Sequence, residues 1–89
     1  MRDRYLEVTY RKGRPFAAYL YLPRPEGAKS ARTELVGEGL VIDLAVDGSP
    51  SGLEITAPGR VSLDEISTVL ARFGQPGLAP NELAPLAAA

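Results

Sequence analysis

Two carboxylates, Asp43 and Glu54, are the residues of this sequence whose type and spacing could do chemistry. They lie in two apolar segments joined by a turn, and side-chain alternation puts both on one face of the predicted hairpin. A register that pairs Leu44 with Leu53 places the two carboxylates directly opposite each other. Because such groups repel, one would hold a proton, and the pair could act as acid and base or bind a hard cation. A carboxylate- or metal-dependent hydrolase is therefore one hypothesis for this chain.

A structural role is the stronger interpretation of the same residues. A tight hairpin turn would pair Leu35 with Leu40 and thereby bring a basic residue opposite the first carboxylate. The result is a row of charges across three strands, formed by Arg32, Asp43 and Glu54. The sequence contains no histidine and no cysteine, which removes the commonest general base, the thiolate nucleophile and the commonest zinc ligands. We therefore expect no catalytic residues, no metal and no cofactor.

The aromatic residues suggest a binding surface. All four tyrosines and Phe16 precede residue 23 and are interleaved with basic residues. A basic, tyrosine-bearing hairpin could bind single-stranded nucleic acid, whose bases stack on rings and whose phosphates attract cations. The composition argues against this use, because the pI is about 5.3 and the net charge is −1. The other interpretation is that the tyrosine face is buried in a dimer, where tyrosine is favoured.

Five strands are predicted to position these residues. Period-2 alternation places them at residues 5–10, 16–22, 32–36, 40–46 and 51–56. In the first hairpin, Tyr10 pairs with Phe16. In the last, a four-residue loop over 47–50 keeps Pro50 out of the ladder and pairs Ile42 with Ile55.

Residues 62–73 predict the one α-helix. Ser62 and Glu65 have the spacing of a capping box, and Gly74 follows as the expected C′ residue. The apolar stripe consists of Leu63, Ile66, Val69, Leu70 and Phe73, and it must cover one face of the sheet. Three prolines prevent a long helix in residues 75–89, where spaced leucines predict an arm docked on the domain.

Length and composition limit the architecture. Eighty-nine residues make one domain, predicted over 1–74, with a C-terminal docking arm over 75–89. Residues 1–32 carry eight basic and three acidic residues (+5), whereas 33–89 carry two basic and eight acidic residues (−6). Such an asymmetry can mark a surface for nucleic acid or an acidic partner. Because the whole chain is not basic, we favour two halves that lie against each other within the chain or meet head to tail across a dimer. The charged start has no secretory apolar region and no run could span a bilayer, so we expect a soluble cytoplasmic protein.

Four short motifs carry a family resemblance. They are Ala18-Tyr19-Leu20-Tyr21-Leu22, Gly39-Leu40-Val41-Ile42-Asp43, Asp47-Gly48 and Gly52-Leu53-Glu54-Ile55. With this spacing, the chain from about Phe16 to Ile55 resembles the small bacterial family catalogued as domain of unknown function 2283. Ser49-Pro50 departs from the pattern. The resemblance implies a compact β-rich domain, and it implies no activity and no catalytic residues.

Together these features predict an α+β fold, with a five-stranded, mostly antiparallel β-meander, one C-terminal α-helix on one face and a proline-rich docking tail. We expect a small non-enzymatic protein-interaction module that forms a homodimer and partners or neutralises another small protein, as an antitoxin does. The expected interaction surface consists of Tyr5, Tyr19, Tyr21, Leu78, Leu83 and Leu86. Nucleic-acid binding through the basic hairpin and hydrolysis at the carboxylates are the two alternatives.

Overall fold

The computed structural model describes residues 4–23 and 30–82 of the chain. Their strands are β1 (Tyr5–Arg11), β2 (Arg14–Tyr21), β3 (Arg32–Gly37), β4 (Leu40–Leu44) and β5 (Pro50–Ile55). The 3-10 turn η1 (Pro58–Arg60) and the helix α1 (Leu63–Arg72) follow. Every strand pair is antiparallel. The predicted α+β fold with a five-stranded antiparallel sheet and one main helix is confirmed.

The strand order in the sheet is β1-β2-β5-β4-β3. Strands β3, β4 and β5 form a meander, and β5 then pairs with β2 of the first hairpin. β5 is therefore the central strand, and its sequence suits that position. Ser51, Gly52, Leu53 and Ile55 are all buried, so small or apolar side chains face both sides.

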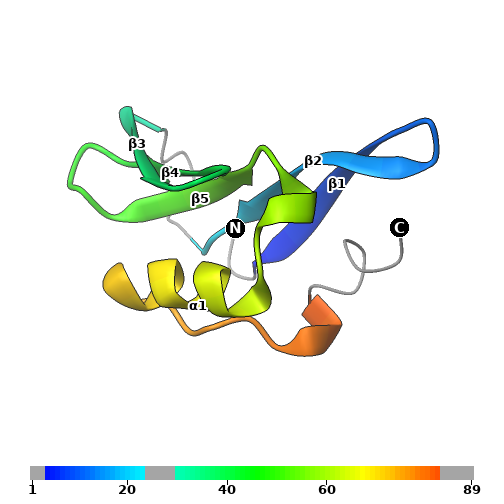
Figure 1. Cartoon of the computed structure of the whole chain (residues 1–89). Coiled ribbons are helices and arrows are strands. Elements are labelled where there is room, and N and C mark those ends of the chain that lie inside the picture. The colour runs from blue at the N-terminus through cyan, green and yellow to red at the C-terminus, as the bar shows by residue number, and fades with distance from the viewer. Residues whose placement is uncertain (1–3, 24–29, 83–89) are drawn as a thin grey trace.

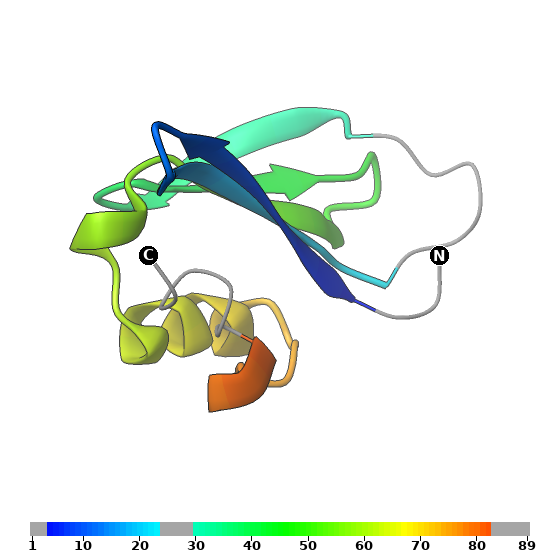
Figure 2. The same ribbon diagram turned by 90° about the vertical axis from the view of Figure 1, so that its right-hand side faces the viewer.

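The molecule has two layers (Figures 1 and 2). The sheet is one layer, and α1 with the segment that follows it lies across one face of the sheet. The buried apolar residues between the layers are Ala18, Leu20, Leu22, Leu40, Ile42, Leu44, Leu53, Ile55, Ile66, Val69, Leu70 and Leu78. Fully burying a leucine or isoleucine contributes about 1.5–3 kcal/mol before conformational entropy is subtracted. None of the helices in the described part of the chain is long and apolar enough to cross a membrane.

Helix α1 has the ends that its sequence predicts. The Ser62 hydroxyl accepts a hydrogen bond from the Glu65 N–H, and the Glu65 carboxylate accepts one from the Ser62 N–H, each at 3.1 Å. At the other end Gly74 has a φ of 73°. The N–H groups of Gly74 and Gln75 donate to the carbonyls of Ala71 and Leu70, which is a Schellman motif.

The segment after α1 is docked on the domain as far as it is described. Leu78 is buried, and its N–H donates to the Ser67 hydroxyl at 3.0 Å. The short distance between the two segments leaves no room at Gly77, where a Cβ would lie 3.0 Å from the Ser67 oxygen. Docking of this arm is observed for residues 75–82, and the predictions for Leu83 and Leu86 lie outside the described residues.

The β1–β2 register is the predicted one over most of its length. Pairs from Tyr5 with Tyr21 to Thr9 with Ala17 follow it, and a bulge then pairs Tyr10 with Pro15. The prediction that Tyr10 pairs with Phe16 was therefore wrong. The reason is the turn, which has only two residues, with positive φ at Lys12 and at Gly13.

The β4–β5 register differs from the prediction by two residues. Ile42 pairs with Leu53 and Leu40 with Ile55, so the predicted pairs of Leu44 with Leu53 and Ile42 with Ile55 were wrong. A two-residue shift keeps every side chain on its face, and this is why the core was predicted correctly while the partners were not.

The loop between β4 and β5 explains that shift. β4 ends at Leu44, and the Ala45 N–H donates to the Ser49 carbonyl at 2.8 Å, which closes a five-residue loop. Val46, predicted as the last residue of the strand over 40–46, is 88% exposed in this loop. Pro50, predicted to stay out of the ladder, is the first residue of β5 opposite Leu44, a position where a strand tolerates a missing N–H.

The β3–β4 register differs by one residue, which reverses the faces of β3. Leu35 pairs with Val41 instead of Leu40, and it is 77% exposed. An irregularity before Gly37 changes the register at the end of this ladder. β3 is an edge strand with few apolar residues, so burial constrains its register weakly.

Candidate interaction surfaces

The face of the sheet turned away from α1 carries a cluster of three tyrosines. We call this the outer face, and its central residues are Tyr5, Glu7, Tyr19, Tyr21, Leu35, Val41, Asp43, Gly52 and Glu54. The rings of Tyr5 and Tyr21 stack with centroids 4.6 Å apart, and the Tyr19 ring meets Tyr21 edge-on at 4.7 Å. None of the described segments crosses this face (Figures 1 and 2).

Tyr19 is held in place by contacts across two neighbouring strands. Its hydroxyl donates to the Asp43 carboxylate at 2.5 Å. To reach β4 the ring crosses β5 above Gly52, where any Cβ would collide with the phenol group. Gly52 is therefore needed for close approach of an aromatic ring, and the ring in turn covers the strand where glycine leaves it bare.

The predicted row of charges is not formed. Arg32 pairs with Leu44, Asp43 with Gly52 and Glu54 with Val41, so the three charged residues do not face one another. The prediction of a row was wrong because it depended on both incorrect registers. Asp43 is instead the acceptor for Tyr19, and Glu54 lies exposed on the outer face.

The same registers place the two carboxylates proposed for hydrolysis diagonally on neighbouring strands and not opposite each other, since Asp43 pairs with Gly52 and Glu54 with Val41. Over residues 4–23 and 30–82, no group of three or more acidic side chains is placed to hold a metal ion.

Leu78 does not share a surface with the tyrosines. It is buried on the helix side of the sheet, as part of the core. Its assignment to the interaction surface was wrong because spacing alone cannot distinguish a leucine that completes a core from one that awaits a partner. Leu83 and Leu86 were assigned to the same surface and lie outside the described residues.

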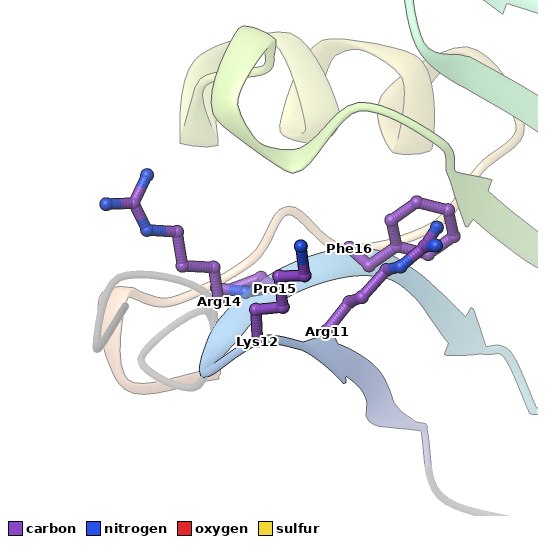
Figure 3. Close-up of a pocket in the computed structure, with 5 residues that line it drawn as sticks. All are labelled: Arg11, Lys12, Arg14, Pro15 and Phe16. Atoms are coloured by element: carbon purple, nitrogen blue, oxygen red, sulfur yellow. The ribbon is translucent and has the colours of Figure 1, made fainter.

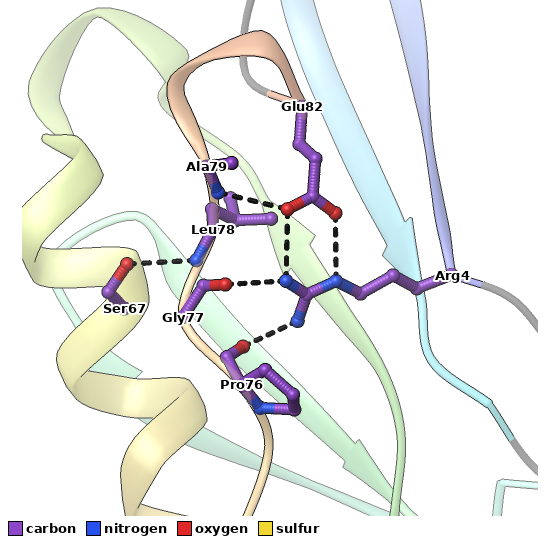
Figure 4. Close-up of polar contacts among 7 residues, drawn as sticks. All are labelled: Arg4, Ser67, Pro76, Gly77, Leu78, Ala79 and Glu82. Carbon is purple, nitrogen blue, oxygen red and sulfur yellow. Dashed lines mark hydrogen bonds and ion pairs between the residues drawn. The ribbon is translucent and has the colours of Figure 1, made fainter.

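A contact that the sequence did not predict joins the start of β1 to the arm (Figure 4). The Arg4 guanidinium donates to both carboxylate oxygens of Glu82, at 2.9 and 3.0 Å. It also donates to the carbonyls of Pro76 and Gly77, each at 2.5 Å. No spacing rule finds a pair 78 residues apart, because the contact exists only once the arm has folded back under the sheet.

The contacts around Glu82 favour its charged form. The hydrogen bonds from Arg4, and after them the bond from the Ala79 N–H at 2.9 Å, lower the pKa of the Glu82 carboxyl. The carboxylate thereby connects the backbone of the arm to the first strand. We call the Arg4–Glu82 pair the lock, because it holds residues 75–82 on the domain.

The second surface is the tip of the β1–β2 hairpin (Figure 3). Arg11, Lys12, Arg14, Pro15 and Phe16 line a shallow depression of about 540 Å³. The Arg11 guanidinium lies over the Phe16 ring, 5.4 Å from its centroid. The basic residues of the first hairpin therefore form a surface that is separate from the tyrosine cluster.

Comparison of this chain with family models, with curated proteins and with solved structures finds no match.

Proposed function

We propose that this chain is a non-enzymatic, cytoplasmic protein-interaction module that acts as a homodimer through its outer face. The single observation that carries the proposal is the cluster of Tyr5, Tyr19 and Tyr21 on a sheet face that no described segment covers. Tyrosine combines a large apolar ring with a polar tip, which suits a surface that is wet in the monomer and buried in the assembly. The family resemblance is consistent with such a module, and we propose that the chain is a divergent member of that family.

A second copy of the chain fits this face. A two-fold axis parallel to the strands and above β5 lays the β1–β2 half of one copy on the β4–β3 half of the other. By the registers of the sheet, Tyr19 of one copy then lies opposite Val41 of its partner, and Tyr21 lies opposite Asp43. Leu35, an exposed apolar side chain without a role in its own core, is covered by β1 of the partner at the level of Glu7 in this arrangement.

The face is small for a dimer interface. Five strands about 4.8 Å apart and about 20 Å long give a planar area of about 500 Å². Specific dimers bury about 800 Å² on each partner, so this interface is at the small end. We therefore expect dissociation in the micromolar range, and with it exchange of the second copy for another small protein, as an antitoxin-like neutraliser requires.

The proposal is tested by sedimentation of the protein over a range of concentrations. Tyr5→Ser removes the most exposed ring of the cluster, and we expect about a tenfold weaker dimer, since tyrosines at an interface commonly contribute more than 1.4 kcal/mol. The matched control is Tyr10→Ser, because Tyr10 is equally exposed (51% against 52%) but lies on the projecting part of β1. A monomer at every concentration contradicts the proposal.

Glu54→Gln distinguishes a second copy from a different partner. In the two-fold arrangement the Glu54 side chains of the two copies lie close together above β5, and neutralising them tightens the dimer. If the face instead serves a basic protein, the same change weakens binding of that partner. Glu34→Gln, an exposed change on the edge strand β3, is the control.

A further inference from the structure

The hairpin arm, residues 9–17, extends beyond the rest of the sheet. β2 pairs with β5 only from Ala18 to Tyr21, so its first four residues have no partner strand other than β1. At about 3.3 Å per residue these residues form a two-stranded ribbon that projects by about 13 Å. Figure 1 shows this ribbon leaving the body of the molecule at one end.

The tip of the arm concentrates positive charge. Arg11, Lys12 and Arg14 line its depression, and no acidic residue shares the lining. By contrast, two other arginines of the described chain are paired with carboxylates, Arg4 with Glu82 and Arg60 with Glu38. Three cations at one tip attract an anionic partner at short range, even though the whole chain has a net charge of −1.

The apolar part of the tip lies beside these cations, with Phe16 next to Arg11 (Figure 3). Phe16 is 53% exposed and is the extra residue at the bulge of β2, with no partner opposite it on β1, and Pro15 lies beside it. The Arg11 guanidinium lies over the ring, 5.4 Å from its centroid, which is within the range of a cation–π contact. Figure 3 shows the three basic side chains on the same side of the ribbon as the ring.

We propose that the hairpin arm binds the phosphate backbone of nucleic acid by entering a groove of a duplex. A two-stranded ribbon fits the major groove when it lies along the groove with one face toward the floor, and only this orientation lets Phe16, which lies back from the turn, approach the bases. Arg11, Lys12 and Arg14 then contact phosphates, and Phe16 with Pro15 meets the base edges. Because the three cations contact phosphates and not base edges, the binding is independent of sequence.

The charge distribution confines this binding to the tip. The outer face carries Glu7, Asp43 and Glu54, which repel phosphates and keep the body of the molecule off the duplex. Three phosphate contacts give weak, non-specific binding, with a dissociation constant of roughly 10⁻⁴ to 10⁻⁶ M at physiological salt. The proposal does not depend on the dimer, because the arm and the tyrosine cluster are separate surfaces.

The test is fluorescence anisotropy of a labelled DNA duplex, and of one of its strands, titrated with the full chain at several salt concentrations. Three phosphate contacts predict a slope of log K against log salt of about −2.7 for the duplex and about −2.1 for the single strand. A fourfold rise in salt then weakens duplex binding by about 40-fold. We expect the duplex to bind more tightly at low salt.

The variant that removes the site is Arg11→Gln with Lys12→Gln and Arg14→Gln, which should abolish binding. The matched control, Arg32→Gln with Arg60→Gln and Arg72→Gln, removes three exposed charges elsewhere and should leave the slope unchanged. Phe16→Ala should weaken duplex binding several-fold with the same slope, because it removes no charge. Circular dichroism establishes that each variant is folded.

Several results overturn the proposal. These are no binding to either DNA at low salt, equal losses in the site and control variants, and tighter binding of the single strand than of the duplex. A polyglutamate peptide that binds the arm as tightly as the duplex also overturns it, because the arm would then serve an acidic protein.

Discussion

Arg4 illustrates how one side chain can hold a segment in place. It makes four hydrogen bonds, two to the carboxylate of Glu82 and two to backbone carbonyls of the arm. The side chain is only 13% exposed, so these bonds are partly shielded from water. A planar guanidinium is needed for this, because a lysine ammonium cannot satisfy a carboxylate and two carbonyls in one plane.

We predict that Arg4→Met lowers the free energy of unfolding by about 1–3 kcal/mol, because it leaves a carboxylate and two carbonyls without their donor. Chemical denaturation at neutral pH measures the change. The control is Arg60→Met, which breaks the exposed pair with Glu38 and should cost less than about 0.5 kcal/mol. If the two changes lowered the free energy of unfolding equally, the Arg4–Glu82 pair would contribute no more to stability than an exposed ion pair.

The lock also has a pH dependence. Because the pKa of Glu82 is lower in the folded chain than in the unfolded one, its contribution is fully present above about pH 4.3, the ordinary pKa of an unfolded glutamate. It is lost as the pH falls further, through the folded pKa. Stability measured from neutral to acid pH should therefore fall more steeply in the natural chain than in Arg4→Met.

At the scale of the elements, β5 joins the two halves of the sheet. It pairs with β2 of the first hairpin and with β4 of the meander, and its Gly52 lets Tyr19 of β2 reach Asp43 of β4. The three strands are thus tied by a side-chain bridge as well as by their ladders. Ser51 adds a hydrogen bond from its hydroxyl to the Asp43 carbonyl at 3.3 Å.

We predict that Gly52→Ala destabilises the protein by about 1–2 kcal/mol, because the new methyl group displaces the Tyr19 ring and its hydrogen bond to Asp43 is lost. The measurement is the free energy of unfolding, with near-ultraviolet circular dichroism to follow the tyrosines. In a Tyr19→Ala background the same change should cost little, since the obstructing ring is absent. A full cost in both backgrounds would contradict this explanation.

At the scale of the whole molecule, the basic and acidic halves of the sequence meet through the arm. Arg4 belongs to the first half and Glu82 to the second, and their pair joins the start of β1 to the arm (Figure 4). Leu78 lies between them and α1 and completes the core. An 89-residue chain has a small core, so a leucine contributed by its C-terminal segment matters for overall stability.

We predict that Leu78→Ala lowers the free energy of unfolding by about 2–4 kcal/mol, through lost burial and a residual cavity. Leu35→Ala, which removes an equal side chain that is 77% exposed, should cost less than about 0.5 kcal/mol in the monomer. Denaturation at low protein concentration provides the comparison. If Leu35→Ala destabilised the monomer more than Leu78→Ala, the assignment of Leu78 to the core would be wrong.

The core and helix α1 could be predicted because local periodicity determines them. The inward faces of β2, β4 and β5 follow from the alternation of apolar residues, and the capping box at Ser62 marks the start of the helix. The projecting basic tip could be predicted in part, from the cations that flank Gly13.

The sequence by itself determined which residues of the main strands face the core, because burying apolar side chains selects a face. Only the tertiary structure decided their partners. A two-residue slip between β4 and β5 leaves the same side chains buried, and the choice depended on how the loop closes through Ala45 and Ser49. The Arg4–Glu82 lock and the Tyr19–Asp43 bond likewise join residues distant in sequence, and they form only when burial has already brought their elements together.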